Sequence, residues 1–79
     1  MNPDDVKVLL ENALPDCLFQ VETDGGHFNI VAIGDLFEGK RPVQRQQQIY
    51  AALNEKISSG AIHAVNMKTL THQEWNDRS

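Results

Sequence analysis

Residues 18–33 read LFQVETDGGHFNIVAI, and this stretch decides the fold. Apolar and polar side chains alternate with a period of two from Leu18 to Thr23, and the alternation resumes from His27 or Phe28 to Ile33. The Asp24-Gly25-Gly26 segment between them tolerates positive φ angles and predicts a tight reversal. The stretch therefore predicts a β-hairpin. Both faces of its second half are apolar near the end, so we expect a central strand covered by helices on at least one face.

Helical patterns flank the hairpin. Asn2 suits an N-cap and Pro3 the first helical position. A longer helix is predicted from about Pro42 to Ser58, with Gly60 as a left-handed stop just beyond it. Pro15 and Asp16 end the first helix. Helical spacing predicts the buried face of each helix: Val6, Leu9, Leu10, Ala13 and Leu14 in the first, and Val43, Gln46, Ile49, Tyr50, Leu53 and Ile57 in the second.

The remaining segments complete an α-β-β-α-β order, which is an α+β fold class. The loop after the hairpin is expected to hold one helical turn around Asp35 to Phe37, and residues 62–70 predict a third strand. The Thr71-His72-Gln73-Glu74 sequence has the form of a capping box. It predicts a short final helical turn that carries Trp75.

The order of the elements has a geometric consequence for two histidines. A helix between the second and third strands is what a parallel crossover requires. If these strands are adjacent and parallel, their N-terminal ends lie at the same edge of the sheet. His27 begins the second strand and His63 lies near the start of the third. The topology therefore predicts that the two histidines are neighbours in space.

Composition limits the class of protein. The chain has 79 residues, of which 41% are apolar and 23% charged, and its net charge is −4. We expect one domain over residues 1–79, with an ordered core over 1–75 and a frayed tail over 76–79. The acidic balance argues against a general nucleic-acid binder. One cysteine cannot form an internal disulfide, and the longest uninterrupted apolar run, residues 30–33, is too short to span a membrane, so we expect a cytoplasmic protein.

The reactive side chains do not form a recognisable catalytic set. No Cys–His or Ser–His–Asp arrangement occurs at a familiar spacing, and a domain of this size leaves little room for a closed site, so we expect no enzymatic activity. Cys17 lies beside Leu18 and Phe19 and is expected to be a small buried hydrophobe. His72 lies inside the expected capping box and is expected at the surface.

Four groups of residues stand out along the chain: Phe37-Glu38-Gly39-Lys40, then Val43, Arg45 and Tyr50, then Ile62-His63-Ala64, and finally Thr71 through Glu74-Trp75. Together these motifs resemble the BolA family. They occur in the family's order and spacing, and the similarity covers nearly the whole chain. The Gly34-Asp35-Leu36-Phe37 loop is most similar to the short bacterial IbaG/YrbA-type branch of the family.

The resemblance implies an αββαβ fold related to the type II KH domain, with a three-stranded mixed sheet and helices on one face. It also implies a heterodimer with a monothiol glutaredoxin, bridged by a [2Fe–2S] cluster to which glutaredoxin and a glutathione each give a thiolate. The positions that match the family's own ligands are His27 and His63. Alone, the chain would be a monomer or a weak homodimer. Without the resemblance, a solvated or backbone-bonded histidine is the simpler interpretation of each position.

The resemblance carries a second hypothesis, a DNA-binding transcriptional regulator of the stress response. DNA contact would fall on the basic cluster of Lys40, Arg41 and Arg45, which could also contact glutaredoxin or glutathione carboxylates, or simply be solvated. Many family members have Arg-His-Arg where this chain has Arg45-Gln46-Gln47. The Gly-x-x-Gly loop of RNA-binding KH domains is also absent. The first departure weakens the DNA hypothesis, and the second argues against nucleic-acid binding of the KH type.

Overall fold

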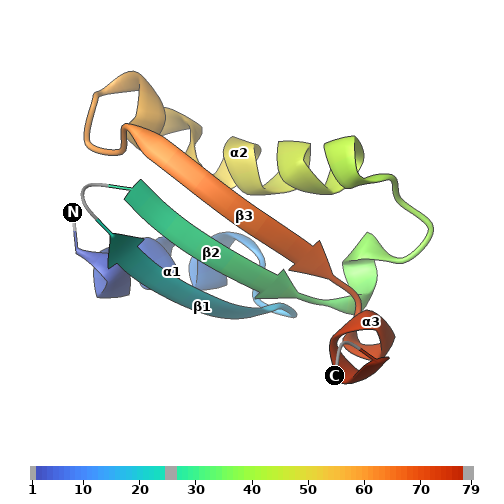
Figure 1. Ribbon diagram of the computed structural model, residues 1–79. Helices are drawn as coiled ribbons and strands as arrows, with labels where there is room; N and C mark the ends of the chain where they lie inside the picture. The colour runs from blue at the N-terminus through green and yellow to red at the C-terminus, as the bar shows by residue number, and fades with distance from the viewer. Residues whose placement is uncertain (1, 25–26, 78–79) are drawn as a thin grey trace.

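The computed structural model describes residues 2–24 and 27–77, and within them the α-β-β-α-β order and the mixed sheet are as expected (Figure 1). The strand order is β1-β2-β3. Strands β1 and β2 are antiparallel, and β2 and β3 are parallel. The elements are α1 (Pro3–Ala13), β1 (Leu18–Asp24), β2 (His27–Ile33), the 3₁₀ turn η1 (Asp35–Phe37), α2 (Pro42–Ser58), β3 (Ala64–Leu70) and α3 (His72–Asp77).

The inner face of the sheet carries the core. Alternation within each strand places every second residue on this face, and the register stacks Val21, Ile30 and Met67 across the three strands. Ile30 is 1% exposed. The helices α1 and α2 both pack on this face, through the fully buried side chains Val6, Leu10, Ile49 and Leu53. The expected arrangement of helices on one face is confirmed.

The outer face of the sheet changes character from one edge to the other. At the C-terminal end of β2, the paired residues are apolar: Leu18, Ile33 and Leu70. Towards the N-terminal end they become Glu22, Asn29 and Asn66, and the last rung is Asp24, His27 and Ala64. The polar end of this face is therefore the end at which His27 lies.

The predicted helix punctuation is confirmed. The Asn2 side chain accepts a hydrogen bond from the Asp5 N–H at 2.8 Å. Gly60 follows α2 with φ +82°, a left-handed conformation that a side chain would disfavour. The Thr71 hydroxyl accepts from the Glu74 N–H at 3.1 Å, and the Glu74 carboxylate accepts from the Thr71 N–H at 2.8 Å. This reciprocal pair is the expected capping box.

The buried face of α2 is narrower than its helically spaced pattern predicted. Ile49 and Leu53 are fully buried, whereas Val43 is 60% exposed and Tyr50 is 42% exposed. Because each residue turns a helix by about 100°, Tyr50 points away from the stripe that begins with its neighbour Ile49. Val43 and Tyr50 therefore lie on the solvent side of the helix.

Two boundaries differ from their expected positions. Strand β3 begins at Ala64 rather than at residue 62, because the Ile62 N–H donates to the Lys56 carbonyl at 3.2 Å and closes the end of α2. Helix α3 continues to Asp77, two residues past the expected core. The tight reversal expected after Asp24 falls on Gly25 and Gly26, which lie outside the described residues.

Within residues 2–24 and 27–77, no helix combines the length and apolar character needed to cross a membrane.

Candidate metal-ligand site

His27 and His63 lie on neighbouring segments at one edge of the sheet, as the topology predicted. Strands β2 and β3 run parallel, and His27 is paired with Ala64. His63 immediately precedes that pair. Both histidines are exposed to solvent. Two histidines from distant parts of the sequence therefore lie at the N-terminal edge of the same parallel strand pair, open to solvent.

His27 lies on the outer face of the sheet, because its neighbour Phe28 is buried in the inner face. Asp24 is directly opposite His27 on β1 and belongs to the same rung. One rung further in, the Asn66 Nδ2 donates to the Asn29 Oδ1 at 3.2 Å. This side-chain bond ties β2 to β3 and helps to hold the two histidine-bearing segments in a fixed relation.

His63 lies in a stretch without charged side chains. No Asp, Glu, Lys or Arg occurs from Ile57 to Met67. A Cβ atom placed on Gly60 would lie 3.9 Å from the His63 Cε1, an ordinary contact distance. The buried Ile62 anchors the segment in the core on the other side. His63 is thus held beside the end of α2 with no neighbouring cation in its own segment to compete with a metal.

Two histidines could supply two nitrogen ligands to a metal centre. Imidazole nitrogen is a known substitute for thiolate on an iron of a [2Fe–2S] centre. In the part of the chain that the structure describes, no three His, Cys, Asp or Glu side chains are grouped closely enough to hold a metal ion. Two imidazoles at this edge would therefore need a partner to supply the remaining ligands.

Cys17 is remote from this edge. It is 5% exposed, and its neighbour Leu18 is paired with Ile33 at the opposite end of β2. Burial raises the pKa of the Cys17 thiol, and the nearby Asp16 carboxylate raises it further. A thiol that resists ionisation is a poor metal ligand. The expectation that Cys17 is a core residue is confirmed.

The similarity to known proteins settles the family. The profile of BolA-like proteins matches residues 1–74. The chain belongs to the BolA family. It is 42% identical over 79 residues to a protein from the rpoN-murA intergenic region of Acinetobacter guillouiae, an alignment that covers 100% of this chain and 95% of that protein. It is also 40% identical over 75 residues to the acid stress protein IbaG of Escherichia coli strain K12, covering 95% and 89%.

Solved structures support the BolA fold independently. A BolA homologue from Coxiella burnetii superposes with a TM-score of 0.86 at 32% identity, covering 96% of this chain and 97% of that chain. The mixed three-stranded sheet and the helix order are therefore those of the family.

The basic cluster expected from the BolA resemblance is largely engaged within the molecule. The Arg45 Nε donates to the Lys40 carbonyl at 2.9 Å, and Nη1 donates to the Thr69 carbonyl at 3.0 Å. The Arg45 guanidinium also forms an ion pair with Glu74 at 2.7 Å. The Lys40 Nζ donates to the Leu36 carbonyl at 2.9 Å. The partner or nucleic-acid contact of Lys40, Arg41 and Arg45 stays a prediction, and Arg41 is the exposed member of the three.

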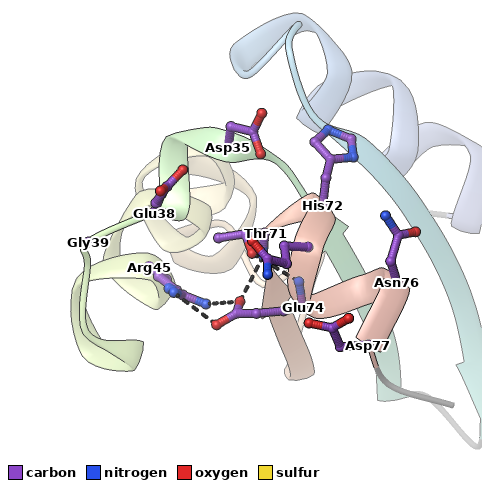
Figure 2. Close-up of a pocket in the computed structure, with 10 residues that line it drawn as sticks. Asp35, Glu38, Gly39, Arg45, Thr71, His72, Glu74, Asn76 and Asp77 are labelled. Atoms are coloured by element: carbon purple, nitrogen blue, oxygen red, sulfur yellow. Dashed lines mark hydrogen bonds and ion pairs between the residues drawn. The ribbon is translucent and has the colours of Figure 1, made fainter.

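Arg45 was not identified as a structural residue from the sequence. Arg45 lines a groove of about 670 Å³ between η1, the start of α2 and α3. Figure 2 shows the lining residues, with dashed lines from Arg45 to Glu74 and from Glu74 to Thr71. The guanidinium and the capping box lower the pKa of Glu74. This groove lies at the C-terminal end of β2 and β3, opposite the histidine edge. Its other ionisable lining residues are Asp35, Glu38, His72 and Asp77.

Proposed function

We propose that this BolA-family chain is a non-catalytic iron–sulfur adaptor that shares a [2Fe–2S] cluster with a monothiol glutaredoxin and its glutathione. The observation that carries the proposal is the juxtaposition of His27 and His63 at one sheet edge, on segments far apart in sequence. Both side chains are exposed, so a partner that carries the other half of the ligand set can approach them.

The contribution of this chain would be two neutral donors. Each histidine must be deprotonated to offer a ring nitrogen, and the bond to iron competes with the proton at that nitrogen. A cluster held by two thiolates and two imidazoles differs in charge and in reduction potential from one held by four thiolates. The shared cluster is cargo that the adaptor passes on or senses, and the sheet edge fixes the two donors relative to one another.

The name of one relative supports a role for this chain in acid stress. The IbaG protein of Escherichia coli is described as an acid stress protein. Histidine is the side chain whose unperturbed pKa, about 6.5, lies nearest to mildly acidic conditions. Imidazole ligation would therefore make the shared cluster sensitive to mild acid, and we extend a stress-response role to this chain on that ground.

Co-expression with a monothiol glutaredoxin tests the proposal. The expected product is a coloured, iron-containing heterodimer. His63→Ala and His27→Ala should each abolish or alter its visible spectrum while circular dichroism shows a folded chain. His72→Ala is the matched control, since His72 is exposed but begins α3 at the opposite edge of the sheet. A heterodimer spectrum that survives both His27→Ala and His63→Ala would contradict the proposal.

DNA binding is a weaker candidate for this chain. The net charge is −4, and Lys40 and Arg45 both donate hydrogen bonds within the molecule. A phosphate-driven interaction should weaken steeply as salt increases, whereas cluster ligation should barely change. Measuring both interactions at low and high salt distinguishes the two functions.

A further inference from the structure

The rung that contains His27 holds one candidate hydrogen-bond partner for its ring. The three residues of the rung are Asp24 on β1, His27 on β2 and Ala64 on β3. Directly opposed residues of an antiparallel pair project from the same face, with Cβ atoms about 4.5–5.5 Å apart. The Ala64 side chain has no polar atom. Within this rung, all of which the structure describes, the side-chain oxygen acceptors are those of the Asp24 carboxylate.

Residues in the next rung are less suited to this role. Glu22 lies on the same face of β1 but is paired with Asn29. Its diagonal separation from His27 is roughly 7–8 Å between Cα atoms. The Asn29 oxygen already accepts from Asn66. Asp24 is thus the carboxylate directly opposite His27 on this face, one strand away, and the two side chains form no hydrogen bond or ion pair in the described structure.

A ligating imidazole has two nitrogens with different tasks. One binds the metal, and the N–H of the other is nearly always held by a carboxylate, a backbone carbonyl or water. The second bond fixes the tautomer and the orientation of the ring, and it makes the ligating nitrogen more basic. A carboxylate is the strongest of these acceptors.

We propose that Asp24 is a positioning residue for His27: in the cluster-bound heterodimer the Asp24 carboxylate accepts the ring N–H and so directs the other ring nitrogen to the shared cluster. This inference rests on the proposed function. It adds a residue to the site that the histidine motifs did not include, and it gives a role to the exposed acidic end of β1.

The test compares three variants of the purified heterodimer. Asp24→Ala removes the acceptor and the charge, and Asp24→Asn keeps an acceptor oxygen but removes the charge. Glu22→Gln removes one carboxylate from the same strand face one rung away and is the matched control. We expect Asp24→Ala to lose the cluster to a chelator about 10-fold faster than the wild type. Asp24→Asn should be intermediate, and Glu22→Gln should match the wild type.

The reduction potential of the cluster separates positioning from a merely structural role. Loss of the carboxylate makes His27 a weaker donor, so Asp24→Ala should raise the potential more than Glu22→Gln does. Unfolding of each isolated chain checks that the fold is unchanged. Suppose that the wild-type heterodimer holds a cluster, and that Asp24→Ala and Glu22→Gln retain the cluster equally and have equal reduction potentials. That result overturns the positioning role alone. A wild-type heterodimer without a cluster overturns the proposed function and the positioning role with it.

Discussion

Arg45 should be required for stability, and Arg45→Ala tests this. Its side chain is 12% exposed and donates to the Lys40 and Thr69 carbonyls at 2.9 and 3.0 Å. A hydrogen bond from a charged donor contributes roughly 1.5–3 kcal/mol, part of which water recovers when the side chain is removed. We leave the Glu74 ion pair out of the sum, because Glu74 is 46% exposed and solvent screens the interaction. The free energy of unfolding should therefore fall by about 2–4 kcal/mol.

Urea denaturation followed by circular dichroism measures this loss, and thermal unfolding should show a midpoint lower by roughly 10–25 °C. Arg45→Lys should retain little of the stability, since an ammonium cannot reproduce the planar fork of donors. Arg41→Ala is the control, because Arg41 is exposed and should change stability by less than about 0.5 kcal/mol. Equal denaturation midpoints for Arg45→Ala and Arg41→Ala would refute the structural role of Arg45.

Four further outcomes are expected. Cys17→Ser should leave the visible spectrum of the heterodimer unchanged. Alkylation of Cys17 should require global unfolding, because burial raises the pKa of its thiol, and rapid alkylation of the native chain would contradict its buried position. Gly34→Ala should cost about 1–3 kcal/mol, since the added Cβ would lie 2.5 Å from the Cys17 Sγ, and Cys17→Ala should recover part of that loss; an equal cost in both backgrounds would exclude the steric cause. Arg45 and Thr71 lower the pKa of Glu74, so the ionised carboxylate stabilises the fold fully at pH values above the ordinary glutamate range, and this stabilisation is lost as the pH falls through the lowered pKa of the folded state. Glu74→Gln should therefore make the free energy of unfolding depend less on pH below about pH 4.5. An unchanged pH dependence in that range would argue against the pairing of Glu74 with Arg45. The mixed cluster should begin to bleach below roughly pH 6, in milder acid than the cluster of a glutaredoxin homodimer; bleaching of both at the same pH would leave the histidines without a special role.

Local signals were sufficient to predict most of the fold. Asn2, Pro3 and Gly60 act on the backbone within one helical turn, so their effect on the helix ends can be derived from the sequence. The rule that parallel strands are joined through a crossover helix predicted the parallel pairing of the second and third strands, and with it the placement of His27 and His63 at one edge of the sheet. The candidate site was therefore predictable in placement, because sheet topology alone decides it.

Contacts between distant segments were not predictable in the same way. Arg45 bonds to the Thr69 carbonyl and to Glu74, which are separated from it by 24 and 29 positions. A basic residue near a helix start gives no sign of such partners, so it was interpreted as part of a contact surface. The exposure of Val43 and Tyr50 was likewise not predictable, since helical spacing does not show how many residues of the helix the sheet can bury.

The proposed role of Asp24 could have been suspected from the sequence. Asp24 and His27 are separated by two residues in the expected hairpin and are directly paired in the structure, and a carboxylate opposite a candidate ligand is a signal of its own. The start of β3 could not have been located, because the Ile62 N–H bonds back to α2 while its side chain continues the apolar pattern.

The most direct test of the central claim is the origin of the nitrogen ligands of the shared cluster. Pulsed electron paramagnetic resonance of the reduced heterodimer detects nitrogens bound to iron, and ¹⁵N-labelled histidine can be introduced into this chain alone before it is combined with unlabelled glutaredoxin. We expect the label to change the strongly coupled nitrogen signals, and His63→Ala to remove them or the cluster that carries them. A cluster whose nitrogen couplings do not respond to labelling of this chain would contradict ligation by His27 and His63.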